Sequence, residues 1–160
     1  MSRILVVWFS RTGITRGVAE RLVRSLGAQA CPLTERRSRL GPIGYLRSVW
    51  EASTGRDASI EPIACDPRAA DLVVIGTPIW GWHLSSPVRA FVRGHASEIR
   101  RAAFFCTMGG AGDAQAFGEL ERLLGRAPVA TLALADREID RPAGAARIDA
   151  FVAALKQAQP

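Results

Sequence analysis

The chain has 160 residues, of which 48% are hydrophobic and 22% charged, so it can form one folded domain and is not intrinsically disordered. It contains no apolar stretch of about 18 residues, and its first residues lead directly into a short apolar run without a signal-peptide pattern. We therefore expect a single cytoplasmic domain with no membrane span. The formal net charge of +6 comes almost entirely from scattered arginines, which argues against nucleic-acid binding but is compatible with an anionic substrate or an acidic partner.

The three cysteines are Cys31, Cys65 and Cys106, which are widely spaced and odd in number. They form no C-x-x-C motif, and the chain has only two histidines that could complete a metal site. We therefore expect buried free thiols, not a disulfide framework or a zinc site.

The chain opens with a predicted strand, a polar turn and a predicted helix. Residues 4–9 are apolar and rich in β-branched side chains, which is typical of a parallel strand buried on both faces. Residues 18–26 place their apolar side chains on one face at helical spacing. The turn between them, residues 10–15, reads Ser-Arg-Thr-Gly-Ile-Thr.

This turn has the composition of a phosphate-binding loop. A strand that feeds a helix through a tight turn directs the free N–H groups of the first helical turn, and the positive end of the helix dipole, at one point. Ser10, Thr12 and Thr15 add hydroxyl groups, and Gly13 permits a close approach. The loop lacks the Gly-Lys-Ser/Thr of nucleoside triphosphatases and a G-x-G-x-x-G, so one phosphate monoester fits better than a triphosphate. From these residues alone, an ordinary capped turn is the alternative.

The next part of the chain is less regular. Residues 28–33 predict a short, weak strand, and residues 43–52 repeat apolar side chains at helical spacing. Tyr45 and Trp50 in this helix could cover a cofactor, but aromatic residues at this spacing are more often part of a core. Residues 57–67 predict a loop limited by two prolines.

A second strong buried strand, residues 71–77, precedes a loop with two tryptophans. Trp80 and Trp82 flank Gly81, and indole rings in a loop outside a strand end indicate a binding surface for a flat aromatic ligand. Two tryptophans packed over the edge of the sheet are the alternative. His83 could donate protons to a substrate, but a lone histidine is more often a hydrogen-bonded loop residue, so we assign no catalytic residue. A helix is predicted at 86–94.

The remaining elements repeat the alternation of strand and helix. Strands are predicted at 102–108 and 128–134, and helices at 114–124 and 142–156. The turn after the first of these strands is rich in glycine. Strands that alternate with helices predict an α/β fold with a three-layer, doubly wound, five-stranded parallel sheet. Ligands of such sheets bind outside the carboxyl ends of the strands, where the strand order reverses.

Three of these loops resemble the flavin-binding loops of the flavodoxin-like superfamily, and the resemblance spans nearly the whole chain. Residues 10–15 resemble the [T/S]-x-T-G-x-T loop that holds the phosphate of FMN in flavodoxins. Residues 77–81, followed by Pro-Val-Arg-Ala-Phe at 87–91, resemble the second flavin loop. Residues 107–112 resemble the Thr-x-Gly-Gly-x-Gly loop of flavodoxin-like quinone reductases. A receiver domain of the same fold class is excluded, since Ser10 and Thr77 stand where it needs acidic residues.

The resemblance implies the strand order 2-1-3-4-5 and non-covalent FMN as cofactor. Loops 10–15 and 78–83 would then face each other, one at the phosphate and one at the ring. Trp80 would be the first ring contact and Trp82 the second, and the Gly81 peptide could rotate toward flavin N5. The implied cofactor-binding residues are Ser10, Arg11, Thr12, Gly13, Ile14, Thr15, Pro78, Ile79, Trp80, Gly81, Trp82, Thr107, Met108, Gly109, Gly110 and Gly112.

The function expected first is electron transfer through FMN, with a redox protein or a quinone-like molecule as partner. The basic charge departs from the acidic charge of typical flavodoxin shuttles. Asp113, directly after the third loop, is the one acidic residue in or next to these loops, and Arg11 in the first loop is basic. The loops therefore disfavour the anionic reduced flavin less than acidic loops would, which is compatible with two-electron reduction of a quinone. An NAD(P)H:quinone reductase, a menaquinone-dependent protoporphyrinogen oxidase and a flavin-free binding module are the alternatives.

Overall fold

A computed structural model describes residues 2–36, 41–54 and 58–159, with the backbone alone for residues 51–53. Its sheet has five parallel strands in the order β2-β1-β3-β5-β6, and the short β4 pairs antiparallel with the end of β3. In the numbering of the predicted strands this order is 2-1-3-4-5, so the doubly wound parallel sheet is confirmed. The strands are β1 (Ile4–Trp8), β2 (Gln29–Pro32), β3 (Leu72–Trp80), β4 (His83–Leu84), β5 (Ala102–Met108) and β6 (Thr131–Ala135).

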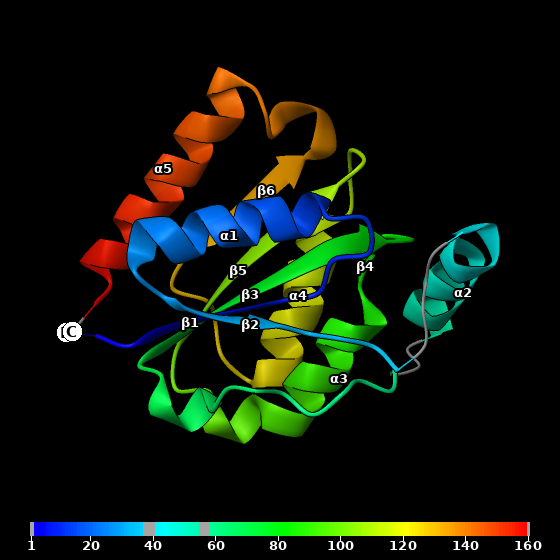
Figure 1. Cartoon of the computed structure of the whole chain (residues 1–160), viewed down its shortest axis with the longest axis horizontal. Coiled ribbons are helices and arrows are strands. Elements are labelled where there is room, and N and C mark those ends of the chain that lie inside the picture. Colours follow the sequence, from blue (N-terminus) through cyan, green and yellow to red (C-terminus); the bar gives the residue numbers. More distant parts are fainter. Residues whose placement is uncertain (1, 37–40, 55–57, 160) are drawn as a thin grey trace.

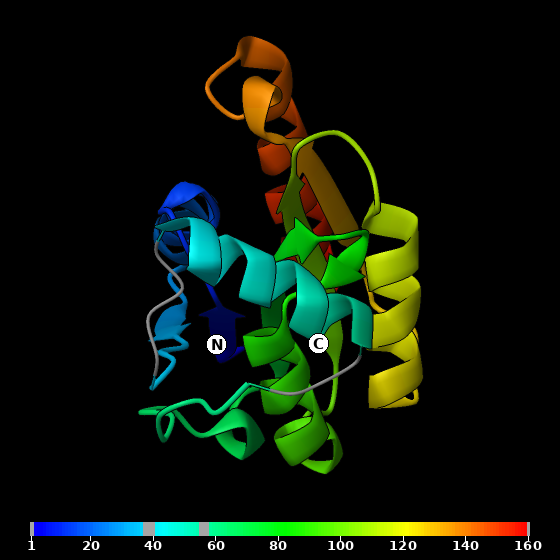
Figure 2. The ribbon, with the colours of Figure 1, turned by 90° about the vertical axis from the view of Figure 1, so that its right-hand side faces the viewer.

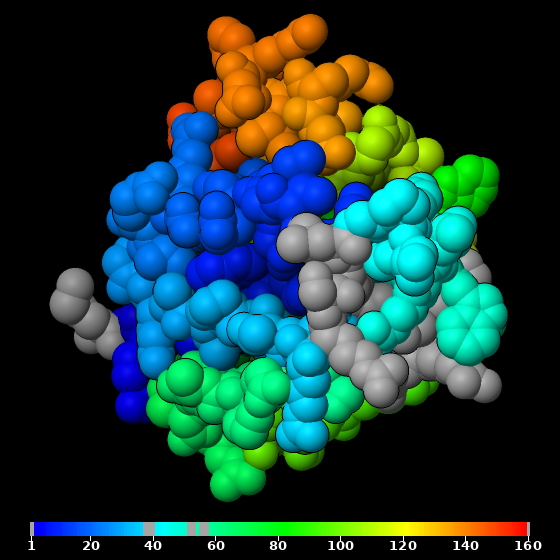
Figure 3. Space-filling view, turned by 45° about the vertical axis from the view of Figure 1, so that its right-hand side comes forward, coloured from blue at the N-terminus to red at the C-terminus, as the bar shows by residue number. Residues whose placement is uncertain are grey.

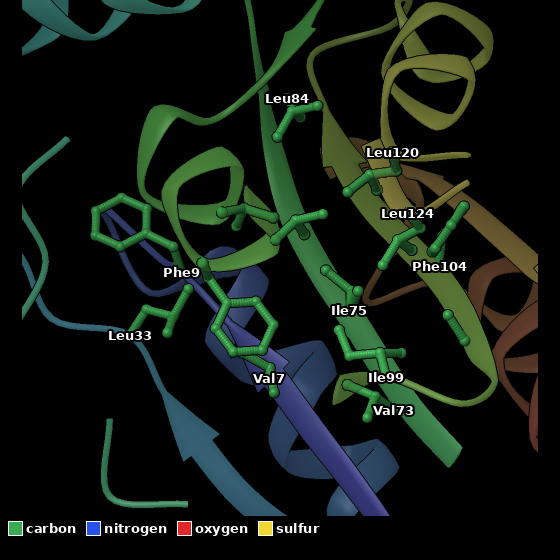
Figure 4. Close-up of a cluster of buried hydrophobic side chains, with 14 of the residues drawn as sticks. Val7, Phe9, Leu33, Val73, Ile75, Leu84, Ile99, Phe104, Leu120 and Leu124 are labelled. Atoms are coloured by element: carbon green, nitrogen blue, oxygen red, sulfur yellow. The ribbon is translucent and has the colours of Figure 1, made fainter. Parts of the chain in front are cut away.

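The central strands are buried because helices cover both faces of the sheet (Figure 1). Helices α1 (Ile14–Leu26) and α5 (Pro142–Gln157) lie on one face, and α3 (Ser86–His95) and α4 (Asp113–Leu124) lie on the other. Each face encloses its own apolar cluster, and alternate residues of one strand belong to different clusters, as the period of a strand requires. Figure 4 shows the cluster beneath α3 and α4.

One close contact crosses the centre of the sheet. Gly76 of β3 lies opposite Phe105 of β5, and a Cβ atom at Gly76 would stand 2.0 Å from the Phe105 ring. The absence of a side chain at this position makes room for a fully buried phenylalanine.

Helix α2 (Gly41–Thr54) confirms the helix predicted at 43–52, but the expectation that its aromatic residues belong to the core is wrong. Tyr45 is 51% exposed and Trp50 is 52% exposed. Ile43 and Leu46 are exposed as well. The reason is position: α2 lies beyond the carboxyl edge of the sheet and not over a face of it, as Figure 2 shows.

A disulfide joins Cys31 to Cys65, which contradicts the expectation of three free thiols; only Cys106 keeps a free, buried thiol. Cys31 lies on the edge strand β2, and the segment before β3 runs back alongside this strand. The Glu61 N–H donates to the Thr34 carbonyl at 2.7 Å, and the two cysteine Cα atoms come within 6.1 Å. This approach depends on tertiary structure, so cysteine spacing does not reveal it.

Most predicted boundaries agree with the structure within two residues, with three exceptions. Helix α1 begins at Ile14, four residues before the apolar run predicted at 18–26. Strand β3 continues to Trp80 and turns into a hairpin with β4, where a loop was expected after residue 77. Strand β6 begins at Thr131, three residues later than predicted. The 3₁₀ turns are η1 (Pro67–Ala69), η2 (Ala96–Glu98) and η3 (Asp136–Glu138). Within the described ranges, no helix has the length and apolar character needed to cross a membrane.

Candidate functional site

A cavity of about 260 Å³ opens at the carboxyl edge of the sheet, between the ends of β1 and β3 where the strand order reverses. All three predicted loops contribute to its wall, and helix α2 and the end of β6 add one residue each. The lining residues are Arg11, Thr12, Ile14, Thr15, Tyr45, Pro78, Ile79, Trp80, Thr107, Met108, Gly109 and Asp136. The expectation that loops 10–15 and 78–83 meet across the switch point therefore holds.

The first helix begins at this cavity without a side-chain cap. Its N-cap is Gly13, with a φ of 98°, and the first helical bond runs from the Gly17 N–H to the Gly13 carbonyl. The first turn carries no acidic residue. Ser10 Oγ accepts a hydrogen bond from the Gly13 N–H at 3.0 Å and so holds the bend of the loop. The N–H groups of the first turn and the helix dipole are thus directed toward Thr12 and Thr15 in the cavity wall.

A buried hydrogen bond ties the first loop to the third. Thr15 Oγ1 and Thr107 Oγ1 lie 2.8 Å apart, and the two residues are 2% and 3% exposed. The loops after β1 and β5 come from distant parts of the chain, so this bond fixes their relative position at the floor of the cavity.

The second loop is a two-residue hairpin. Gly81 and Trp82 both have positive φ, 52° and 67°, as a type I′ turn requires. Trp80 is only 5% exposed and packs edge-on against Phe9, with ring centroids 5.5 Å apart. The expectation of two exposed indoles is therefore wrong for Trp80, which is part of the core and of the cavity wall, and right for Trp82, which is 60% exposed.

The glycine-rich third loop packs against this hairpin. Gly112 is the N-cap of α4, with a φ of 107°, and a Cβ atom there would lie 2.9 Å from Trp82 Cα. A side chain at Gly112 would therefore push the hairpin away. Gly109 and Gly110 face open space instead.

Two lining residues lie outside the predicted set. Tyr45 comes from α2, whose surface (cyan) lies beside that of the first part of the chain (blue) in Figure 3. The Arg11 guanidinium lies 5.4 Å from the centre of the Tyr45 ring. Asp136 directly follows β6, and partial burial raises the pKa of its carboxyl group. The rule that ligands bind at the carboxyl ends of the strands could have indicated Asp136. No local signal in the sequence places α2 at this edge.

Some predicted residues shape the site without lining the cavity. Ser10, Gly13, Gly81 and Gly112 set the backbone of the three loops, as described above, and Gly110 lies in the third loop. Trp82 is exposed in the turn of the hairpin, next to Gly81, and His83 lies behind the hairpin, on the side of α4.

No protein-family model matches the chain, and no curated protein sequence does. Solved structures do match its three-dimensional form. One of them is a flavoprotein from Lactobacillus acidophilus NCFM in complex with FMN. The match covers 88% of this chain and 98% of the flavoprotein, with a TM-score of 0.71 and 17% sequence identity. The fold is flavodoxin-like. A candidate flavoprotein from Bacteroides eggerthii DSM 20697 covers 94% with 98% of its own length, at a TM-score of 0.77 and 24% identity.

Another flavodoxin-like structure is that of the two-electron reduced flavodoxin of Megasphaera elsdenii. It covers 97% of this chain with 99% of its own length, at a TM-score of 0.62 and 16% identity. The flavodoxin-like fold thus extends over nearly the whole chain, as the sequence motifs indicate.

Proposed function

We propose that this chain is an FMN-binding redox protein that transfers electrons through non-covalently bound FMN. Three loops of the kind that hold FMN in flavodoxins line one cavity here, at the switch point of the sheet. Structural neighbours include a flavoprotein in complex with FMN and a flavodoxin. The observation that carries the proposal is the uncapped start of α1, which opens into the same cavity as the tryptophan loop.

The cavity wall fits the two chemically different parts of FMN. At the start of α1, backbone N–H groups, the positive dipole end and the Thr12 and Thr15 hydroxyls would hold the phosphate. Ile79, Trp80 and Met108 form an apolar wall for the ring. Gly81 has the conformational freedom to turn its peptide as the ring changes protonation.

Bound FMN supplies the redox chemistry, and the protein sets its potential and its access to partners. Arg11 brings a positive charge to the cavity and Asp136 a carboxyl group. Desolvation at the cavity wall raises the pKa of the Asp136 carboxyl group, while the residue as a whole is exposed, so solvent screens its charge. The wall therefore opposes a reduced, anionic cofactor less than a row of exposed carboxylates would. We infer that a quinone-like acceptor or a redox protein receives the electrons.

A quinone oxidoreductase is the second candidate function, and the rim of the cavity favours it. Tyr45 in the cavity wall and Trp82 in the turn of the adjoining hairpin present exposed aromatic rings. A flat apolar acceptor could stack there. Sustained oxidation of NADH or NADPH in the presence of a soluble benzoquinone would identify the enzyme, and its absence would favour the shuttle.

The proposal is tested by titrating the protein with FMN and with riboflavin, which lacks the phosphate. We expect one FMN per chain, and riboflavin about 100-fold weaker, because charge-assisted hydrogen bonds to phosphate contribute roughly 1.5–3 kcal/mol each. Thr12→Val should weaken FMN binding about tenfold and leave riboflavin binding unchanged.

Thr131→Val, at an exposed threonine on the edge strand β6, is the matched control and should change neither affinity. Equal binding of FMN and riboflavin would disprove the phosphate site. A protein that binds neither would instead be a flavin-free module on this fold.

A further inference from the structure

A cluster of polar side chains lies behind the hairpin of β3 and β4, outside the cavity wall. It consists of His83 from β4, Glu119 from α4 and Arg89 from α3. The Arg89 Nε donates to Glu119 Oε1 at 2.7 Å, and the two side chains are 1% and 11% exposed. This buried ion pair fixes the carboxylate between α3 and α4.

The second oxygen of this carboxylate is directed at the histidine. Glu119 Oε2 is buried and has no hydrogen-bond partner among the described residues. His83 Nδ1 lies 3.6 Å from it, which is within ion-pair distance but too long for a hydrogen bond. A buried carboxylate oxygen without a partner is costly, so this arrangement favours a proton on Nδ1 that faces Glu119.

The other ring nitrogen indicates the same tautomer. His83 Nε2 lies 3.5 Å from the side-chain nitrogen of Gln115, and an amide nitrogen can only donate. In the neutral ring this long contact favours Nε2 as the acceptor and Nδ1 as the nitrogen that carries the hydrogen. The His83 side chain is 29% exposed, so the surrounding groups hold the ring without closing it off from solvent.

The hairpin brings this ring close to the cavity. His83 is the direct cross-strand partner of Trp80, which lines the cavity. Opposite residues of an antiparallel pair have Cα atoms about 5 Å apart. An acceptor bound at the edge of the cavity beside Trp80 therefore lies within about one side-chain length of the imidazole.

We propose that His83 is the proton donor to a quinone-like acceptor at this rim, and that Glu119 and Arg89 are positioning residues that orient its ring. The inference rests on the proposed FMN function. Reduction of a quinone to a hydroquinone takes two electrons and two protons. Bound, reduced FMN would supply both electrons and one proton as hydride. The second proton would pass from Nε2 of the His83 imidazolium to the quinone oxygen, once the exposed Gln115 side chain, which contacts Nε2 in the neutral ring, has moved aside. The neutral ring then regains a proton from water.

The test compares two acceptors that differ in their need for protons. FMN-loaded protein is photoreduced and mixed with 1,4-benzoquinone, which takes protons, or with ferricyanide, which takes only electrons. We expect His83→Gln to slow benzoquinone reduction about 100-fold, Glu119→Gln to slow it about tenfold, and neither to change ferricyanide reduction. His95→Gln is the matched control, because His95 also contacts a glutamate, Glu98, at 2.7 Å but lies at the far end of α3.

A second measurement needs neither FMN nor turnover. Long-range ¹H–¹⁵N spectra of the flavin-free protein report which imidazole nitrogen carries the hydrogen. We expect Nδ1–H for His83 in the wild type and a loss of this preference in Glu119→Gln. A wild-type ring with the hydrogen on Nε2 would overturn the positioning role.

The outcomes separate this inference from the proposed function. If FMN binds and ferricyanide is reduced, but His83→Gln reduces benzoquinone within about twofold of the wild-type rate, the proton-donor role is wrong. Equal slowing with both acceptors would also overturn it, because it would show a general packing defect. Failure to bind FMN at all would contradict the proposed function, while the spectra would still test the contact between Glu119 and His83.

Discussion

At the scale of single residues, the site contains backbone strain where the hairpin turns. Trp82 is the one non-glycine residue with a positive φ among the described residues, at 67°. The left-handed region is unfavourable for a bulky side chain by roughly 1–2 kcal/mol, and such strain persists mostly at functional sites. Because the indole ring is largely exposed, its packing contributes little free energy to offset this strain. The conformation is explained if the ring serves a ligand at the rim.

Replacing Trp82 by asparagine should therefore stabilise the protein while it weakens the site. Asparagine tolerates the left-handed region, so we expect the temperature of thermal unfolding to rise by about 3 °C. This rise corresponds to a gain of about 1 kcal/mol in the free energy of unfolding. Trp82→Ala is the control: it removes the ring but keeps the Cβ penalty, and it should give no such rise. If both variants were equally stabilised, exposure of the indole and not backbone strain would be the cause.

Gly76→Ala should destabilise the centre of the sheet. The added Cβ would overlap the Phe105 ring, and overpacking of this kind typically lowers the free energy of unfolding by roughly 1–3 kcal/mol. Gly118 lies on the exposed face of α4 with open space around it, so Gly118→Ala should instead raise the free energy of unfolding by about 0.8 kcal/mol. Urea denaturation measures both. A neutral Gly76→Ala variant would show that Phe105 can move aside.

At the scale of elements, the disulfide closes the segment that carries α2. Cys31 and Cys65 are 34 positions apart, and Tyr45 of the cavity wall lies between them. Chain-entropy arguments give such a cross-link about 2–4 kcal/mol of stabilisation. We expect Cys31→Ser/Cys65→Ser to unfold at a lower temperature than the wild type by a corresponding amount. A reducing dithiol should lower the unfolding temperature of the wild type and leave that of the variant unchanged.

Thiol counting checks the disulfide independently. Burial raises the pKa of the Cys106 thiol to about 12, so the native protein should react only slowly with a thiol reagent. In guanidinium chloride one thiol should react, and after reduction all three cysteines should react. Three reactive thiols without reduction would show that the bridge does not form.

A second link between elements should appear in the pH dependence of stability. Hydrogen bonds from His95 and then Arg68 lower the pKa of the Glu98 carboxyl below 4.5 and tie η1 to the end of α3. The pKa of Glu98 is lower in the folded state than in the unfolded state. The stabilisation from these bonds is therefore present above pH 4.5 and is lost as the pH falls through the folded-state pKa. Glu98→Gln should therefore unfold at a lower temperature at pH 7 and match the wild type in acid. Glu121→Gln, at an exposed site on α4, is the control.

At the scale of the whole molecule, local sequence patterns predicted those parts of the fold that depend on neighbouring residues alone. Apolar runs with β-branched residues predicted the buried strands, and their alternation with helices predicted a doubly wound parallel sheet. The resemblance of three loops to those of flavodoxins supplied the strand order and hence the two loops that face each other. The position of α2, the Cys31–Cys65 bridge and the burial of Trp80 depend on contacts between distant segments. Their residues have the same local pattern in either environment, so the sequence could not place them.

The most direct test of the account follows the backbone amides by NMR while FMN is added. We expect the largest changes in chemical shift at residues 11–15, 79–82 and 107–112, because the phosphate should contact the start of α1 and the ring should contact the other two loops. Amides at the opposite edge, such as Asp71 and Arg101, should stay unchanged. Changes gathered at that opposite edge, or no changes at saturating FMN, would contradict the proposed site.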